Sequence, residues 1–273
     1  MNSFSEMYSK IIEGYRWTAI NIDTTHRCLL QCQFCSRQSE IQGKPMISDY
    51  RKSYGDLKTK ELIKLTDFVR SGISFCGQIS DPIYHKDFIS LLSSIDDVTY
   101  LEKIEIHTNG SGKKQEYWDE LVDVAWQLET RIEWHFGIDG IDEKAAIHRV
   151  GQDFHSAFEA MKYVASRQKK EPEHERWRVI WQYIPFAYNE HEIVKAKEMA
   201  DEIDVELILL TSGRFTPDSP VAPPTGINLI SEKLFGEIKK PNIVIPNSVS
   251  TNQFKPTGEN KREELKINKD EFL

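Results

Sequence analysis

The sequence predicts an α/β fold, a partial (β/α)6 barrel of the TIM type with an irregular C-terminal extension. Three observations indicate this fold: short apolar runs alternate with amphipathic segments from Trp17 onward, six such runs occur, and the alternation ends after Phe215. Repeated strand–helix units form parallel sheets with right-handed crossovers. Six strands favour a partial barrel over a complete eight-stranded one, and a doubly wound open sheet is the alternative.

The elements follow from hydrophobic periodicity. Strands are expected at Thr18–Ile22, Ile73–Gly77, Ile104–Thr108, Ile132–Ile138, Val179–Ile184 and Val205–Leu210. Helices are expected at Thr59–Arg70, Asp87–Ser94, Gln115–Thr130, Phe154–Arg167 and Glu190–Glu202. Within the first helix, apolar residues recur at helical spacing: Leu62, Leu65, Phe68 and Val69. Asn189 and Glu192 have the spacing of a capping box that opens the last helix.

The chain divides into two parts. We expect residues 1–215 to form the barrel domain, with an N-terminal helix over residues 1–14, and residues 216–273 to form the extension. Four prolines within Thr216–Thr225 indicate an irregular connection, because proline lacks the amide N–H that helices and strands use.

The formal net charge of −8 argues against non-specific binding to nucleic acid or to a membrane surface, since both favour a basic face. Residues 24–54 differ, with five basic and two acidic side chains. This surplus indicates either an ordinary solvated loop or a docking surface for an acidic partner. No apolar run approaches membrane-spanning length and no secretory leader is visible, so we expect a cytoplasmic protein.

Three of the four cysteines, Cys28, Cys32 and Cys35, lie in the run Cys-Leu-Leu-Gln-Cys-Gln-Phe-Cys. Clustered thiols without a disulfide pattern are typical of metal ligands in a reducing compartment. Three protein ligands leave a coordination position for a reacting molecule. The alternative is a zinc site completed by His26, although the paired spacings usual for zinc are missing. Cys76 is interpreted as a buried core thiol.

Polar and glycine-rich residues follow the expected strands, where the loops of a parallel barrel build the active site. These segments are Cys76–Pro82, His107–Gly110, Gly137–Gly140, His148–Gly151, Trp181–Tyr183 and Thr211–Phe215. Their gathering at one rim favours a binding site for a polar cofactor. Strand alternation puts Glu105 and His107 on the same face as Asn109.

With these motifs the chain resembles the radical S-adenosylmethionine (SAM) enzymes. It meets the family's C-x3-C-x-aromatic-C pattern, with Phe34 in the aromatic position. The stretch Gly77–Pro82 corresponds to a glycine-rich family motif that ends in Glu-Pro, but here it ends in Asp-Pro. The Thr-Asn-Gly and Ile-Asp-Gly strand ends also match. The likeness extends from Trp17 to Phe215 and is closest to the branch that includes SPASM and twitch extensions.

The resemblance implies that the three cysteines hold a [4Fe-4S] cluster and that SAM chelates its fourth iron. One electron would cleave SAM to methionine and a 5′-deoxyadenosyl radical, which abstracts hydrogen from an unidentified substrate. The implied cofactor-binding residues are Phe34, Gly77, Gln78, Asp81, His107, Asn109, Asp139, Arg149 and Gln182.

Individual roles are implied in the same way. Asp81 would meet the SAM amino group and Arg149 its carboxylate, while small Gly137 would leave room for the adenosine. The structural alternatives are a turn cap for Asp139, a surface position for Arg149 and core packing for Gln182. The candidate substrate residues are Trp181, Tyr183, Thr211 and Arg214, and Trp181 has core packing as its alternative.

Auxiliary clusters in the SPASM and twitch branch need cysteines after the barrel, and this chain has none after Cys76. Residues 216–273 are therefore expected to form a degenerate twitch-like cap. Phage-encoded members are common in that branch, which suggests a phage-encoded protein acting in a bacterial host.

The leading hypothesis is a radical SAM enzyme, with a small molecule or nucleotide precursor favoured over a peptide as substrate. We prefer a small molecule because the sequence shows no cysteines for auxiliary clusters and no recognisable peptide-binding domain. A flavodoxin or ferredoxin is expected to donate the electron. The competing hypothesis is a non-catalytic Fe–S or zinc-binding sensor or scaffold.

Overall fold

The computed structural model describes residues 17–33, 35, 37, 55–66, 69–76, 79–95, 101–128, 130–168, 177–210 and 221–226. All of them belong to one compact unit, Met1–Ile243. The expected helix over residues 1–14 lies outside the described residues, as does most of the 216–273 extension. No helix in the described part of the chain combines the length and the apolar character needed to cross a bilayer.

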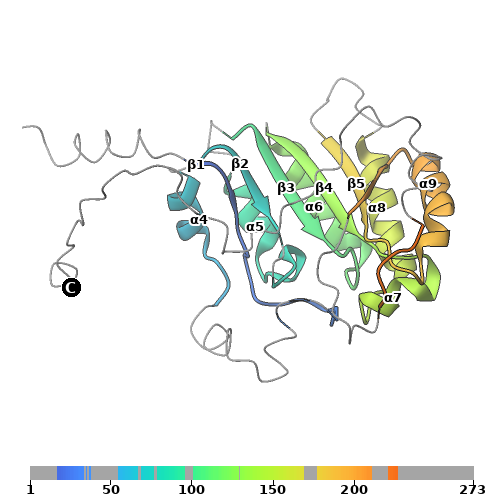
Figure 1. The fold of residues 1–273 in the computed structure, drawn as a ribbon. Helices are drawn as coiled ribbons and strands as arrows, with labels where there is room; N and C mark the ends of the chain where they lie inside the picture. Colours follow the sequence, from blue (N-terminus) through green and yellow to red (C-terminus); the bar gives the residue numbers. More distant parts are fainter. Residues whose placement is uncertain are drawn as a thin grey trace, which may run out of the picture. The chain divides into compact units, whose positions relative to one another are not determined.

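Six parallel strands form one sheet, with neighbours in the order in which they occur along the chain. They are β1 Trp17–Asn21, β2 Val69–Phe75, β3 Lys103–Thr108, β4 Arg131–Gly137, β5 Trp177–Tyr183 and β6 Glu206–Leu209. A doubly wound sheet reverses its strand order at a switch point, and this sheet does not. The sheet is open, so the expected partial barrel of the TIM type is confirmed (Figure 1).

Helices connect the strands. They are α4 Thr59–Thr66, α5 Phe88–Ser93, α6 Gln115–Gln127, α7 Ala145–His148, α8 Phe154–Gln168 and α9 Ile193–Glu202, with short 3₁₀ turns at Pro82–Tyr84, Asp142–Lys144 and Glu190–Glu192. The expected first helix was too long, because α4 ends at Thr66 and Val69 already belongs to β2. Val69 and Ile73 of β2 are both buried in the core.

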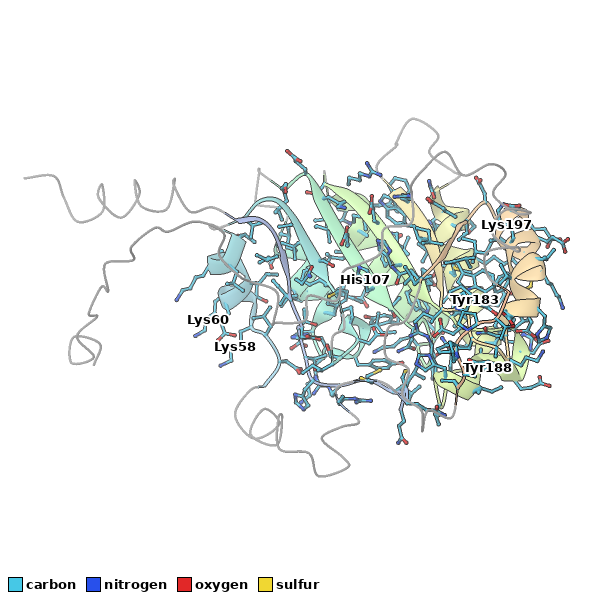
Figure 2. All side chains as sticks on the ribbon, viewed as in Figure 1. Lys58, Lys60, His107, Tyr183, Tyr188 and Lys197 are labelled. Atoms are coloured by element: carbon cyan, nitrogen blue, oxygen red, sulfur yellow. The ribbon has the colours of Figure 1, made fainter. Side chains whose placement is uncertain are left out.

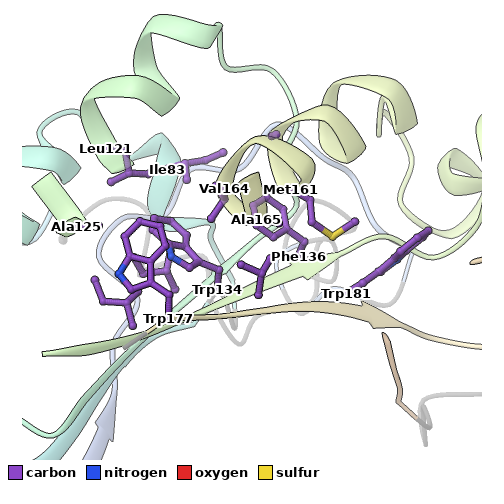
Figure 3. Close-up of a cluster of buried hydrophobic side chains, with 14 of the residues drawn as sticks. Ile83, Leu121, Ala125, Trp134, Phe136, Met161, Val164, Ala165, Trp177 and Trp181 are labelled. Carbon is purple, nitrogen blue, oxygen red and sulfur yellow. The ribbon is translucent and has the colours of Figure 1, made fainter. Parts of the chain in front are cut away.

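The hydrophobic core lies between the sheet and the helices that cover one of its faces. Alternate residues of β3 are buried, and all residues of β4 after Arg131 are buried. Trp134 and Phe136 of β4 pack under α6 and α8 together with Trp181 of β5 (Figure 3). Large aromatic side chains dominate the energetics of such cores.

The opposite face of the sheet is polar on β3 and β4, and the register of the strands sets its pattern, with Ile180 and Ile208 as apolar neighbours on the same face. Lys103 pairs with Arg131, Glu105 with Glu133, and His107 with His135 across β3 and β4. Figure 2 shows His107 among the side chains of these central strands. We call this surface the polar face; it comprises Lys103, Glu105, His107, Arg131, Glu133, His135, Arg178 and Gln182.

The expected capping box at Asn189 is wrong. No hydrogen bond from the Asn189 side chain caps the following turn. Its Oδ1 instead accepts from the Phe186 amide at 2.6 Å, and its Nδ2 donates to the carbonyls of Asp139 and Ile184. The Glu192 carboxylate accepts from the Ile141 amide. Both side chains therefore join the loops that follow β4 and β5.

Candidate active site

The cysteine loop follows β1 at the carboxyl edge of the sheet and is fixed to the loop that follows α7. The amide of Gln31 donates to the Val150 carbonyl at 2.9 Å, and that of Gln33 donates to the His148 carbonyl at 3.2 Å. Arg37 donates from Nη1 to the Cys28 carbonyl at 3.0 Å and from Nη2 to the Leu30 carbonyl. These bonds hold the backbone around Cys28 and Cys32 in place.

The thiols of this loop fit a metal cluster chemically. Cys28, Cys32 and Cys35 are all free of disulfides and partly exposed. Burial raises the pKa of Cys28 to about 12, and burial also raises the pKa of Cys32, although the charge of Arg149 opposes that rise. Without a cation the two thiols stay protonated, and bound iron would supply the positive charge that makes them thiolates.

The ends of β2 and β3 meet this loop through a buried carboxylate. Asp81 is 3% exposed, and its Oδ2 accepts from Asn109 N at 2.7 Å, Asn109 Nδ2 at 2.6 Å and Thr108 Oγ1 at 3.1 Å. The same Asn109 Nδ2 lies 3.6 Å from Cys28 Sγ. Burial raises the pKa of Asp81 to about 6, although these hydrogen bonds oppose the shift. Asp81 thus positions Asn109 against Cys28, and its contact with the SAM amino group stays a prediction.

A buried ion pair closes the site beyond β4. Asp139 is fully buried, and its Oδ2 accepts from Arg149 Nε at 2.7 Å and His148 Nδ1 at 2.9 Å. Its Oδ1 accepts from the Ile184 amide at 2.8 Å. Burial alone would raise the pKa of Asp139, but the charge of Arg149 and the bond from His148 hold that pKa below its usual range. Asp139 therefore acts as an ionised anchor.

The space over Gly137 is not open for adenosine, contrary to our expectation. A Cβ at Gly137 would lie 2.7 Å from Arg149 Nη2, so the guanidinium lies directly on the glycine. Because Asp139 binds Nε, the two Nη groups remain as donors toward the site. Arg149 is not the surface residue of the alternative interpretation: its side chain is 18% exposed, and its charge reaches Cys32.

Residues of β5 divide between the two faces of the sheet. Gln182 lies on the polar face, with its Nε2 2.9 Å from His135 Nδ1. Trp181 and Tyr183 are fully buried on the helix side, where Trp181 Nε1 donates to the Ile138 carbonyl and Tyr183 donates to the Asn189 carbonyl. The expectation that Trp181 and Tyr183 face the substrate is therefore wrong, because alternation turns them away from Gln182.

Five predicted site residues, Phe34, Gly77, Gln78, Thr211 and Arg214, lie outside the described residues. The structure adds one residue that the sequence did not suggest. Gln152 is 6% exposed, and its Nε2 donates to the carbonyls of Asn109 at 3.1 Å and Gly137 at 2.9 Å. It ties the ends of β3 and β4 together. Nothing in the sequence separates this glutamine from an exposed one.

A basic cavity of about 630 Å³ opens beside Cys28. Arg27, Arg37 and Lys113 line it, and none of the described residues that line it is acidic. The ammonium of Lys113 lies 4.3 Å from the ring centroid of Tyr117, and burial lowers the pKa of Lys113. Two of the five basic residues of the 24–54 stretch, Arg27 and Arg37, line this cavity, and Arg27 is also paired with Asp56.

Comparisons with known proteins were made on sequence and on fold. No protein-family model matches the sequence. Molybdenum cofactor biosynthesis protein 1 of Dictyostelium discoideum is 33% identical over 97 residues, which are 34% of this chain and 14% of that protein. The chain therefore matches only a small part of that relative's length.

The fold is similar to that of SuiB from Streptococcus suis. SuiB bound to S-adenosylmethionine has a TM-score of 0.56 at 13% identity, over 85% of this chain and 52% of SuiB. SuiB bound to its precursor peptide SuiA has a TM-score of 0.57 at 14% identity, over 85% of this chain and 50% of SuiB. The chain thus spans about half the length of SuiB. At 13–14% identity, the likeness to SuiB shows a shared fold.

Proposed function

We propose that this chain is a radical SAM enzyme with one [4Fe-4S] cluster on Cys28, Cys32 and Cys35. The observation that carries the proposal is the junction of the cysteine loop with the ends of β3 and β4. Asn109 Nδ2 lies 3.6 Å from Cys28 Sγ, and Arg149, bound by Asp139, is near enough to Cys32 for its charge to oppose the rise in the pKa of that thiol. A SAM-bound cluster would supply a 5′-deoxyadenosyl radical that abstracts hydrogen from the substrate.

The residues of this chain position the cofactor. Asp81 and Asn109 hold the Cys28 side of the loop. Asp139 fixes Arg149 through Nε, so the free Nη atoms can bind the SAM carboxylate as a fork. We also propose that Phe34, Gly77 and Gln78 contact SAM, as the resemblance implies. His107 and Gln182 would face its nucleoside from the polar face.

We further propose a polar small molecule or nucleotide precursor as the substrate. The polar face supports this choice, because its histidines, carboxylates and amide offer hydrogen bonds rather than the apolar pockets that anchor peptide side chains. A peptide is the alternative class, since SuiB binds a precursor peptide. Thr211 and Arg214 remain proposed substrate residues.

We propose that an acidic flavodoxin or ferredoxin docks over the basic cavity beside Cys28. Arg27, Arg37 and Lys113 line this cavity, and complementary charge speeds the encounter of redox partners. Free thiols and a reducible cluster fit a reducing compartment such as the cytoplasm.

Anaerobic reconstitution with iron and sulfide tests the proposal. We expect one cluster per chain and release of 5′-deoxyadenosine from SAM under dithionite, detected by mass spectrometry. Cys32→Ala should lose both properties, whereas Cys76→Ala, a matched cysteine outside the loop, should keep both. A protein that binds iron or zinc without binding SAM would instead be a metal-binding sensor or scaffold.

A further inference from the structure

A second cluster of ionisable groups lies on the polar face, below the strand ends. The chain repeats a Glu-x-His pair on adjacent strands, with Glu105 and His107 on β3 and Glu133 and His135 on β4. The parallel register places the two glutamates side by side and the two histidines side by side. The face therefore carries a row of carboxylates beneath a row of imidazoles.

Three ligand atoms of this cluster converge. One ligand atom each from Glu105, His107 and His135 lie within 4.8 Å of one another. Glu105 Oε2 is 3.6 Å from His107 Nε2. Lys103 binds the other carboxylate oxygen, Oε1, at 2.5 Å, so Oε2 is left facing the imidazole.

His135 gives an independent indication of a ligand. The residue is 8% exposed, and its Nε2 is buried without a hydrogen bond. Glu133 Oε2 lies 3.7 Å from Nε2, which is too long for a hydrogen bond and makes an ion pair only when His135 is protonated. A buried polar atom without a partner is costly. Gln182 Nε2 lies 2.9 Å from His135 Nδ1. For Nε2 to offer a lone pair to a metal, the Gln182 amide must turn over, so that its oxygen accepts the Nδ1 proton.

We propose that Glu105, His107 and His135 bind a divalent first-row transition metal ion such as Zn²⁺. Two imidazoles and one carboxylate are the ligand set of catalytic zinc and non-haem iron sites, which keep open positions. Gln182 and Lys103 then act as outer partners that orient His135 and Glu105. The two rings are stacked, with centroids 4.2 Å apart and planes 7° apart. Because the lone pairs of parallel rings do not meet at one point, the His107 ring must turn about its Cβ–Cγ bond to reach an ion on His135, whose ring Gln182 holds.

The surrounding charges indicate what the open positions would accept. Lys103, Arg131 and Arg178 pair with the glutamates Glu133 and Glu206, so a bound divalent ion adds net positive charge to the polar face. An anionic or oxygen-donor group fits such a centre. The ion would lie about 7 Å below Asn109 and Gly137, two residues along each strand. Its role toward a substrate rests on the proposed function, but the binding of the ion does not.

Metal analysis tests the site on the full chain. After dialysis against Zn²⁺ and then buffer, we expect one zinc per chain in addition to the iron of the reconstituted cluster. The Cys28→Ala/Cys32→Ala/Cys35→Ala variant should bind one Co²⁺ with a visible absorption spectrum that lacks thiolate charge transfer. Cys76→Ala in that background should leave the spectrum unchanged.

Single variants assign the ligands. Glu105→Gln is nearly isosteric, and His107→Phe keeps a ring in the stack. Each should weaken Co²⁺ binding by at least about tenfold. Gln182→Ala should weaken it by about tenfold to a hundredfold. His155→Phe is the matched control, because His155 is an exposed imidazole 3.8 Å from Asp142, and it should bind Co²⁺ like the parent. Substoichiometric binding by the parent, or unchanged affinity in Glu105→Gln, would overturn the proposal. Neither result depends on SAM cleavage.

Discussion

Replacing Asp139 by asparagine removes the charge of a buried carboxylate without changing its size. Asp139 is fully buried and accepts hydrogen bonds from Arg149, His148 and the Ile184 amide. Asparagine offers one acceptor oxygen where aspartate offers two. The Asp139→Asn variant therefore leaves at least one buried donor without a partner, and it leaves the charge of Arg149 uncompensated.

The expected loss of stability follows from this geometry. Removing one partner of a buried ion pair costs about 3–5 kcal/mol. Since the side chain of Arg149 is 18% exposed, water recovers part of the lost interaction, and we expect about 3 kcal/mol. Urea unfolding at neutral pH, followed by tryptophan fluorescence and circular dichroism, measures the free energy of unfolding.

The pH dependence gives a second readout of the same variant. Because the folded pKa of Asp139 is lowered, its stabilising effect is present above the unfolded pKa, about 3.9, and is lost as pH falls through the folded pKa. The Asp139→Asn variant should lack that part of the acid transition. Asp142→Asn is the control, since that side chain is 53% exposed, and it should change stability by less than about 0.5 kcal/mol. A loss in Asp139→Asn below about 1 kcal/mol would refute the reasoning.

Three further predictions concern the same site. The pKa of Asp81 is raised to about 6 when the chain is folded and is about 3.9 when it is unfolded. As pH rises from about 4 to about 6, the wild type should therefore lose up to about 3 kcal/mol of stability relative to Asp81→Asn. A difference in urea unfolding that stays constant across this range would contradict this. Gly137→Ala should weaken SAM binding by about tenfold in anaerobic calorimetry, because its Cβ displaces a charged donor of Arg149. Gly55→Ala, with open space around it, should bind SAM normally. Lys113→Glu should slow the reduction of the cluster by flavodoxin at low salt, because it reverses a charge of the proposed docking surface. Lys60→Glu, outside that surface, should not slow it. Stopped-flow reduction rates that do not depend on salt would contradict a charged docking surface.

The strands and most helices could be predicted because their buried residues recur with the period of a strand or a helix in the sequence. The first helix was extended too far because Phe68 and Val69 fit the helical spacing equally well, and only the sheet decides that Val69 belongs to β2. Short apolar runs do not carry enough information to separate the two structures.

The sequence predicted which residues gather at the candidate site, but not most of the contacts that they make there. Cys28, Asn109, Asp139 and Arg149 come together at one edge of the sheet. The ion pair between Asp139 and Arg149 was not foreseen, because it depends on the path of the loop after β4. Trp181 was placed on the wrong face because Ile180, between Arg178 and Gln182, interrupts the polar alternation of β5.

The central claim is that the three cysteines leave one iron of a cluster to SAM. Electron–nuclear double resonance of the reduced cluster, with SAM isotopically labelled at its amino nitrogen, tests this claim directly. The account predicts a hyperfine coupling from the labelled nitrogen, which Arg149→Ala weakens by lowering SAM occupancy. A reduced cluster that forms normally, yet shows no coupling at saturating SAM, would contradict it.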